Sequence, residues 1–338
     1  EDGAMLSAPR MVYQRNDGLV RFADGVELVQ GSSRLTAPRG IVELGEDDGA
    51  PTAIGLSGGV DVRSLEDSSG AHMELWAATV DTPREPAGNW QLVARTSGPW
   101  IVIRFAGGLD YYERTLKTVS LRAVIAPEGL LTMRAERGVC LEEVPMEGPV
   151  RRAQAETSRA WFADGQLTDV ELDGQVEIEA EETRATGNRA RLVQATGLIM
   201  LQGEPTGRTR VGLTTERGNM SCDEAIVRDR EGKIEARGKI QGEIEEARLL
   251  GTTDNASGST PLRFAGEMLE VEDDGNRFSL RDNARVWQDD RILLADDVIY
   301  LLAEQAVSAR GHVRATFPAE EMAATATGNP EEDVVVDA

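Results

Sequence analysis

The sequence contains several copies of one short unit, and this self-similarity constrains the fold more than any local propensity does. Residues 222–240 align with residues 295–313 without a gap, and six of the nineteen positions are identical. The identical pairs are Asp223/Asp296, Ile226/Ile299, Glu231/Glu304, Ala236/Ala309, Arg237/Arg310 and Gly238/Gly311. Further copies span 8–26 and 37–60, and another ends at 169–178. The sequence therefore predicts a repeat protein.

The middle of each unit is predicted to be a hairpin turn. Asn16-Asp17-Gly18 and Arg230-Glu231-Gly232 each separate two apolar runs, and Gly and Asn adopt the positive φ of such turns at little cost. The equivalent residues of the last copy are Ala303-Glu304-Gln305. Leu, Ala and Glu crowd this copy and by propensity favour a helix, but the repeat overrides that weak preference. We expect strand, turn and strand over 293–317.

Each unit closes on a glycine that leads into a further strand. The instances are GGVDVRS (58–64), DGQVEIEA (173–180), RGKIQGEI (237–244) and RGHVRATF (310–317). Their alternation gives each strand one apolar and one polar face. The glycine marks a bend or a close approach of a neighbouring backbone. His312 fills the slot that Lys239 and Gln175 fill elsewhere, so it is an ordinary repeat position and not a catalytic candidate.

The chain is predicted to consist of two tandem sections and a tail. The segment EEVPMEGPVRRA (142–153), with two prolines and a change of charge, is the best junction. We place an N-terminal section at 1–148 and a C-terminal section at 149–318. The acidic residues 319–338 lack periodicity and are expected to be disordered. Residues 251–260 are expected to form a surface loop.

Composition excludes several functional classes. The formal net charge is −23 and the pI is near 4.6, so a phosphate backbone would be repelled and nucleic acid is not an expected partner. No run approaches the about 18 apolar residues of a membrane-spanning helix. Cys140 and Cys222 have no CxxC or CxxH context, which fits neither a disulfide scaffold nor a zinc site. We interpret them as buried small side chains.

No enzyme, metal or cofactor is predicted. The chain has two histidines, His72 and His312, and no G-x-S-x-G motif. Acidic pairs such as Asp289-Asp290 and Asp296-Asp297 lack the spacing of calcium-binding nonapeptide repeats, so we interpret them as turn and surface residues. A polysaccharide-acting β-helix enzyme is the third functional hypothesis.

Two segments resemble the OstA-like family, which includes periplasmic proteins of lipopolysaccharide transport. TRATGNRARLVQATGLIMLQGEP (183–205) is similar to that family's Ala-x-Gly-Asx-x-Ala start, Thr-Gly spacer and apolar strand closing on Gly-x-Pro. DNARVWQDDRILLADDVIY (282–300) is similar to its Asn-Ala-Arg-Val phrase, polar turn and Leu-x-Ala-Asp ending. The resemblance implies an all-β fold, a V-shaped β-jellyroll or solenoid-like stack of antiparallel strands. It implies acyl chains in the apolar interior, and modules that join end to end through edge strands.

If the interior is a groove, the inward apolar positions of the repeats line it. The candidate ligand-binding residues are Val26, Leu28, Ile41, Leu56, Val60, Val62, Val176, Ile178, Leu198, Met200, Ile226, Ile240, Val286, Ile299 and Val313. The same positions could equally pack against one another as a closed core, because a binary pattern does not distinguish a core from a groove.

The leading hypothesis is a periplasmic lipid-transport or bridge protein without enzymatic activity. Its expected partners, which the resemblance implies, are lipopolysaccharide or a related lipid and other OstA-like modules, including an inner-membrane ABC transporter complex and an outer-membrane barrel. We expect membrane association through those partners or through an N-terminal anchor that precedes Glu1. The alternative from a different class is a structural β-solenoid of the cell envelope with a packed core and no ligand.

Overall fold

The structure is a computed structural model, and its described residues form strands, turns and short 3₁₀ segments. It describes residues 5–30, 33–45, 51–64, 72–83, 90–96, 100–106, 111–126, 129–163, 166–228, 231–245, 247, 249, 260–272, 275–316 and 335–336. The chain divides into two compact units, unit 1 (Glu1–Glu181) and unit 2 (Glu182–Ala338). The junction proposed from the sequence, at 148/149, falls in the turn between β10 and β11 of unit 1. The division into two OstA-like sections stays a prediction.

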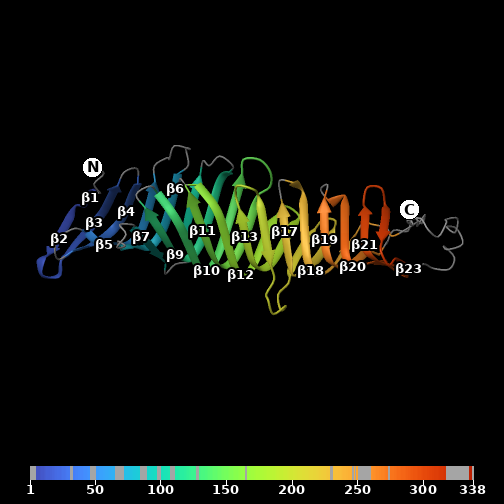
Figure 1. The fold of residues 1–338 in the computed structure, drawn as a ribbon. Helices are drawn as coiled ribbons and strands as arrows, with labels where there is room; N and C mark the ends of the chain where they lie inside the picture. The colour runs from blue at the N-terminus through green and yellow to red at the C-terminus, as the bar shows by residue number, and fades with distance from the viewer. Residues whose placement is uncertain are drawn as a thin grey trace. The chain divides into compact units, whose positions relative to one another are not determined.

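Unit 1 contains twelve strands and the 3₁₀ helix η1 (Figure 1). They are β1 (Met5–Ser7), β2 (Arg10–Gln14), η1 (Arg15–Asp17), β3 (Leu19–Gln30), β4 (Ser33–Leu44), β5 (Pro51–Ser64), β6 (His72–Pro83), β7 (Trp90–Arg95), β8 (Ile101–Ala106), β9 (Tyr111–Ala126), β10 (Gly129–Pro145), β11 (Arg151–Ala163) and β12 (Gln166–Ala180). Each strand pairs antiparallel with its neighbours in sequence, except that β1 and β2 share β3, and β7 and β8 both lie between β6 and β9.

Unit 2 contains the remaining strands. They are β13 (Thr183–Val193), β14 (Leu198–Gln202), β15 (Val211–Thr215), β16 (Gly218–Cys222), β17 (Glu224–Arg228), β18 (Lys233–Ile244), β19 (Leu262–Glu272), β20 (Arg277–Gln288), β21 (Arg291–Leu301), β22 (Ala306–Arg310), β23 (Arg314–Thr316) and β24 (Val335–Val336). β13 pairs with β14 and β15, β18 pairs with β16 and β17, and β21 pairs with β22 and β23, all antiparallel. The predicted fold class, an all-β stack of antiparallel strands, is confirmed.

The last repeat folds as a hairpin and not as a helix, as the repeat predicts. Leu301 of β21 pairs with Ala306 of β22, and Tyr300 pairs with Val307. Gln305 takes a positive φ of 51°, accepts a hydrogen bond from the Tyr300 hydroxyl at 2.8 Å and donates one to the Leu302 carbonyl at 2.9 Å. These bonds hold a turn whose residues would by propensity favour a helix. Most of the predicted acidic tail, apart from β24, lies outside the described residues.

Six of the described strands, β3, β5, β10, β12, β18 and β20, are bent near their middle by a pair of adjacent residues with positive φ, and a seventh such pair lies between β22 and β23. The pairs are Asp24–Gly25, Gly58–Gly59, Arg137–Gly138, Gly174–Gln175, Gly238–Lys239, Asp282–Asn283 and Gly311–His312. The ladder register shifts at the same row in neighbouring strands, for example between Ala23 and Val26 in β3 and between Ser57 and Val60 in β5. The glycines marked by the sequence thus lie at the bends, and each bend divides its strand into two halves.

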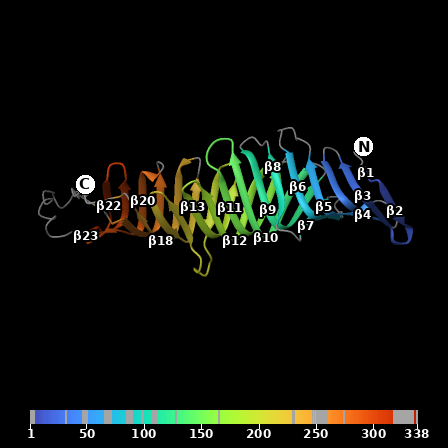
Figure 2. The same cartoon turned by 180° about the vertical axis from the view of Figure 1, so that it is seen from behind.

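The bends let the inner faces of the two strand halves pack on each other. Figures 1 and 2 show strands in two layers within each unit from opposite sides. The largest fully buried side chains are apolar and come from strands along both units: Leu56, Leu75, Ile101, Ile103, Leu121, Leu172, Leu201, Ile240 and Leu262. Each such side chain contributes about 1.5–3 kcal/mol relative to an exposed one. The core therefore runs along the inner faces of each unit.

We expect the bend in β18 to depend on glycine for two separable reasons. A Cβ at Gly238 (φ +76°) would lie 2.4 Å from Asp223 Oδ2 and 2.9 Å from Asp223 Cβ, whereas a Cβ at Gly207 (φ +73°) would meet nothing within 4 Å. Gly207→Ala should lower the free energy of unfolding by about 1–2 kcal/mol through backbone strain alone. Gly238→Ala should lower it further, and urea denaturation measures both. Equal losses would contradict a steric role for Asp223.

Candidate functional site

The fifteen candidate groove residues fall into three groups of burial. Buried are Val26, Leu28, Leu56, Val60, Val62, Val176, Ile240 and Val286. Half-buried are Ile178, Leu198, Met200, Ile226 and Ile299. Ile41 is 38% exposed and Val313 is 42% exposed. Binding of a ligand by any of them stays a prediction.

Five of these residues lie on the outer face, which corrects their predicted inward placement. Leu198 stands two residues before Met200 and three before the buried Leu201, so it shares the outer face with Met200. Ile226 alternates with buried Ala225, and Ile299 lies between buried Val298 and Tyr300. Met200 pairs with Ile226 on the same outer face, and Ile41 lies between the buried residues Gly40 and Val42. Each residue belongs to a run of consecutive apolar or small residues, which fills both faces of a strand. Alternation in the sequence therefore does not reveal which face points inward.

The inner face of unit 1 carries a row of three charged residues near the ends of its strands. Glu143 of β10 lies directly opposite Arg114 of β9 on one side and Arg151 of β11 on the other. The Arg114 guanidinium Nε forms a short ion pair with Glu143 Oε2, and Arg151 Nη1 lies 3.9 Å from Glu143 Oε1. The exposed fraction of the side chain rises from 5% at Arg114 to 17% at Glu143 and 42% at Arg151. We call Arg114, Glu143 and Arg151 the charged row.

Apolar residues follow the charged row towards the interior of unit 1. Leu116, Leu141 and Ala153 form the next inner-face row of the ladder. Thr118, Val139 and Ala155 form the row after that. Successive rows on one face are about 7 Å apart, because each residue rises about 3.4 Å along a strand. The inner wall thus changes from charged to apolar over a short distance.

The opposite layer closes over this wall. The rings of Phe105 in β8 and Phe162 in β11 lie with centroids 6.0 Å apart. Behind them, a cavity of about 40 Å³ is lined by Phe105, Arg114, Leu116, Met133, Val139, Leu141, Ser158, Ala160, Phe162, Leu167, Val170 and Leu172. This volume corresponds to roughly one water molecule. In this part of unit 1 the interior is a packed core.

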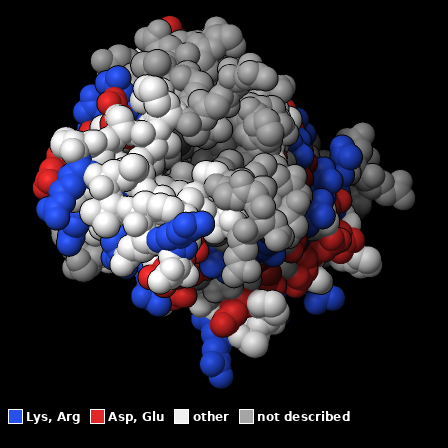
Figure 3. Space-filling view, turned by 90° about the vertical axis from the view of Figure 1, so that its left-hand side faces the viewer, with Lys and Arg blue, Asp and Glu red and all other residues white. Residues whose placement is uncertain are grey.

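The N-terminal end of unit 1 presents an apolar edge. β2 pairs with β3, and no strand among the described residues pairs with its other edge. Met11, Val12 and Tyr13 of β2 are 63%, 46% and 53% exposed, and Met5 of β1 is 63% exposed. Figure 3 views this end, where uncharged side chains make up much of the described surface. An unpaired edge with apolar side chains is a template for another strand.

An open hollow lies against the same end. Its volume is about 1040 Å³, and its lining includes Pro9, Val26 and Pro38 together with the charged residues Asp24 and Arg39. These residues come from the break between β1 and β2, from the bend of β3 and from the register shift of β4. The hollow therefore adjoins the edge that β1 and β2 present.

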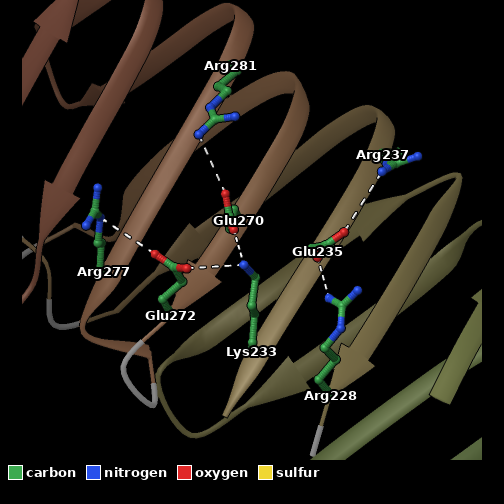
Figure 4. Close-up of polar contacts among 8 residues, drawn as sticks. All are labelled: Arg228, Lys233, Glu235, Arg237, Glu270, Glu272, Arg277 and Arg281. Atoms are coloured by element: carbon green, nitrogen blue, oxygen red, sulfur yellow. Dashed lines mark hydrogen bonds and ion pairs between the residues drawn. The ribbon is translucent and has the colours of Figure 1, made fainter. Parts of the chain in front are cut away.

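The outer face of unit 2 carries a ladder of ion pairs (Figure 4). Lys233 of β18 pairs with Glu270 and, at 3.2 Å, with Glu272, both of β19. Arg281 Nη2 of β20 lies 3.6 Å from Glu270 Oε2, and Arg277 Nε lies 3.9 Å from Glu272 Oε2. These pairs join three neighbouring strands. The acidic side chains here are matched by cations, so we assign the ladder a structural role.

Among the described residues, the cysteines and His312 have side chains with common reactive or metal-binding chemistry. Burial raises the pKa of the Cys222 thiol to about 12, which keeps it protonated, and both cysteines are free. His312 Nδ1 lies 2.8 Å from Asp296 Oδ2 at a side-chain exposure of 91%. Within the described ranges, no group of three or more His, Cys, Asp or Glu could hold a metal ion. There is likewise no helix in them long and apolar enough to cross a membrane.

The charged row was not predicted from the sequence. The available signal was spacing: Arg114 stands two residues before Leu116, and Glu143 stands two residues after Leu141, so each shares a face with a core leucine. That signal identifies a site only when the register of β9 and β10 is known.

Comparison with known proteins shows a distant structural likeness. Neither a family model nor a curated protein matches the chain. Among solved structures, the chain is similar to LptH, the LptA homologous periplasmic component of the conserved lipopolysaccharide transport device from Pseudomonas aeruginosa. The sequence identity is 12%, the match covers 64% of this chain and 96% of that chain, and the TM-score is 0.22. The likeness assigns the chain to no family.

The ion-pair ladder should make unit 2 sensitive to acid. Hydrogen bonding to the Lys233 ammonium lowers the pKa of Glu270 below its ordinary value of 4.5. A lowered folded-state pKa contributes stability above pH 4.5, and this contribution is lost as the pH falls through the folded-state value. Glu270→Gln should therefore lower the urea midpoint at pH 7 and change it less at pH 3. Glu304→Gln, which removes a charge in an exposed turn, is the matched control. If Glu270→Gln lowers the urea midpoint by the same amount at pH 7 and pH 3, the link between stability and the lowered pKa of Glu270 is contradicted.

Proposed function

We propose that this chain is a periplasmic lipid-carrying module without enzymatic activity, which holds acyl chains against the inner faces of its strands. The observation that carries the proposal is the apolar inner face along the strands of each unit, from Val26 and Leu56 in unit 1 to Ile240 and Val286 in unit 2. An extended acyl chain needs a long apolar surface of this kind. The lipid we propose is lipopolysaccharide or a related lipid, on the basis of the sequence resemblance described above.

The acidic character of the chain is compatible with this proposal. Burial of one methylene group is worth about 0.8 kcal/mol, so a twelve-carbon acyl chain gains roughly 10 kcal/mol. Two like charges a few ångströms apart in water repel by only about 1 kcal/mol, and salt screens them. Acyl burial therefore outweighs the repulsion between an anionic lipid and the acidic surface.

A second function is favoured by the small cavity in unit 1. With room for about one water molecule, the inner faces there already pack on each other, which suits a structural β-stack of the cell envelope with no ligand. In the carrier hypothesis an acyl chain must part the two layers and replace their contacts. The two functions therefore differ in whether the inner faces can be reached by a lipid.

Photolabelling should distinguish the two functions. We expect a lipid with a diazirine in its acyl chain, added to the unmodified full chain, to label the inner-face residues Val176 and Ile240. Ile226 and Ile299 have similar chemistry on the outer face and serve as matched controls. Mass spectrometry locates the adducts, and excess unlabelled lipid should suppress those at the inner positions only.

Two outcomes would count against the carrier function. Labelling of Ile226 and Ile299 at the level of Val176 and Ile240 would indicate adsorption of lipid to the surface. Labelling at none of the four positions, with the protein folded by circular dichroism, would favour the structural alternative.

We also propose that partner modules join the chain through the edge that β1 and β2 present. The exposed Met11, Val12 and Tyr13 support strand addition, in which main-chain hydrogen bonds extend the sheet. The partners that the sequence resemblance suggests are other OstA-like modules of a transport bridge, between an inner-membrane ABC transporter complex and an outer-membrane barrel.

A charge on this edge should weaken such joining. Val12→Lys places a buried ammonium in any added strand pair, so we expect self-association or capture of a second module to fall about tenfold or more. Val150→Lys is the matched control, because Val150 is 41% exposed and lies outside the strands. Sedimentation velocity over a concentration series measures the effect. Equal behaviour of both variants and the parent chain would argue against this edge.

A further inference from the structure

The charged row lies at the edge of the inner face of unit 1, where strands end. We call this polar edge the mouth of unit 1. β10 ends at Pro145 and β11 begins at Arg151, so Glu143 and Arg151 lie within two residues of strand ends. Arg114 lies three residues after the start of β9 at Tyr111. The three residues therefore mark one rim of the inner surface, and the leucine row Leu116 and Leu141 lies directly behind them.

The side chains change from charged at the rim to apolar behind it, in the same order as the head group and the acyl chain of an amphiphile. A head group at the charged row would place its acyl chain along Leu116 and Leu141 and then along Val139, on rows about 7 Å apart. Ligand sites in proteins commonly combine such an apolar lining with a few convergent polar groups. Ser158 is buried and adds a second polar group to the lining of the small cavity.

An aromatic contact closes the mouth. Phe105 lies directly opposite Arg114 on the ladder, and its ring meets Phe162 from the other layer at 6.0 Å between centroids. The contact is between side chains of the two layers and involves no backbone pairing between β8 and β11. An acyl chain that enters beside Arg114 would replace one apolar contact with another.

The charges of the row select the head group. Two guanidinium groups flank one carboxylate, and Arg114 is 4% exposed, so its charge acts in surroundings where electrostatic interactions are strong. The planar fork of an arginine matches a carboxylate or a phosphate. A buried ion pair adds little stability compared with apolar packing, so stability alone gives weak grounds for placing Arg114 in an apolar wall.

We propose that the mouth of unit 1, formed by the charged row and by Phe105 and Phe162, binds the anionic head group of an acyl-chain amphiphile, a carboxylate or a phosphate monoester. The proposal rests on the lipid-carrying function above and specifies where the head group lies and which charge it carries.

Binding of single-chain probes to the full chain tests this proposal. Dodecyl phosphate, dodecanoate, monolauroylglycerol and dodecyltrimethylammonium carry similar chains and differ in head group, and calorimetry below their micellar concentrations gives each Kd. We expect the two anionic probes to bind about tenfold tighter than the neutral one, and the cationic probe to bind weakest. The ratio between dodecyl phosphate and dodecanoate tells whether a phosphate lipid or a free fatty acid is the better match.

A pair of double variants locates the effect. Arg114→Leu with Glu143→Leu removes both charges together, so that no buried charge is left alone. It should reduce the preference for anionic probes, because the buried Arg114 is lost and only the more exposed Arg151 remains, while binding of monolauroylglycerol persists. Arg152→Leu with Glu142→Leu removes an ion pair of 2.7 Å between β11 and β10 on the outer face, and should leave the preference intact. If the inner double variant does not fold, the more exposed Arg151→Leu should still reduce the preference.

The outcomes separate the two proposals. Equal binding of anionic and neutral probes would overturn the head-group site and leave the carrier function standing. An anionic preference that is undiminished in the folded inner double variant, or in Arg151→Leu if that variant does not fold, would also overturn the site. If no probe of any charge binds, both proposals fail.

Discussion

The pairs of positive-φ residues that bend the strands are the constraint on which the rest of the structure depends. A flat antiparallel stack would leave one apolar face in water, whereas a bend at the same row of successive strands turns one half of each strand towards the other. Gly58–Gly59 in β5 and Gly238–Lys239 in β18 make this bend at matching shifts of register. Because unit 1 is bent in this way, Phe105 and Phe162 can meet across its interior.

Ion pairs on the outer face of the bent strands differ in exposure from those on the inner face. On the outer face, pairs such as Lys233 with Glu272 are partly exposed, and each is worth little because water and salt screen it. On the inner face, Arg114 and Glu143 lie where burial strengthens their interaction and makes a lone charge costly. The same residue types thus support the stack on one side and can recognise a charge on the other. The large negative charge of the whole chain does not determine what the interior binds.

Sequence reasoning succeeded where the repeat fixed the local backbone. The turn at 303–305 and the bend at Gly311–His312 follow from aligned copies that contain Asn-Asp-Gly or Gly-x-Val, and the structure has both. It failed where several apolar residues stand in succession, since Ile226 and Ile299 satisfy an apolar pattern on either face. Only the burial of Ala225 and Val298 identifies the inner face. The ligand-binding role of the candidate residues stays a prediction.

The sequence by itself determined the all-β class, the hairpin unit and the bends at Gly58, Gly174, Gly238 and Gly311, because these depend on φ preferences and on alternation within a few residues. The tertiary structure alone decided which alternate residues of each apolar run face inward. It also brought Arg114, Glu143 and Arg151 into one row. Those features depend on the register between strands and on the closure of two layers. Register and closure join residues far apart in the chain, and no local pattern encodes them.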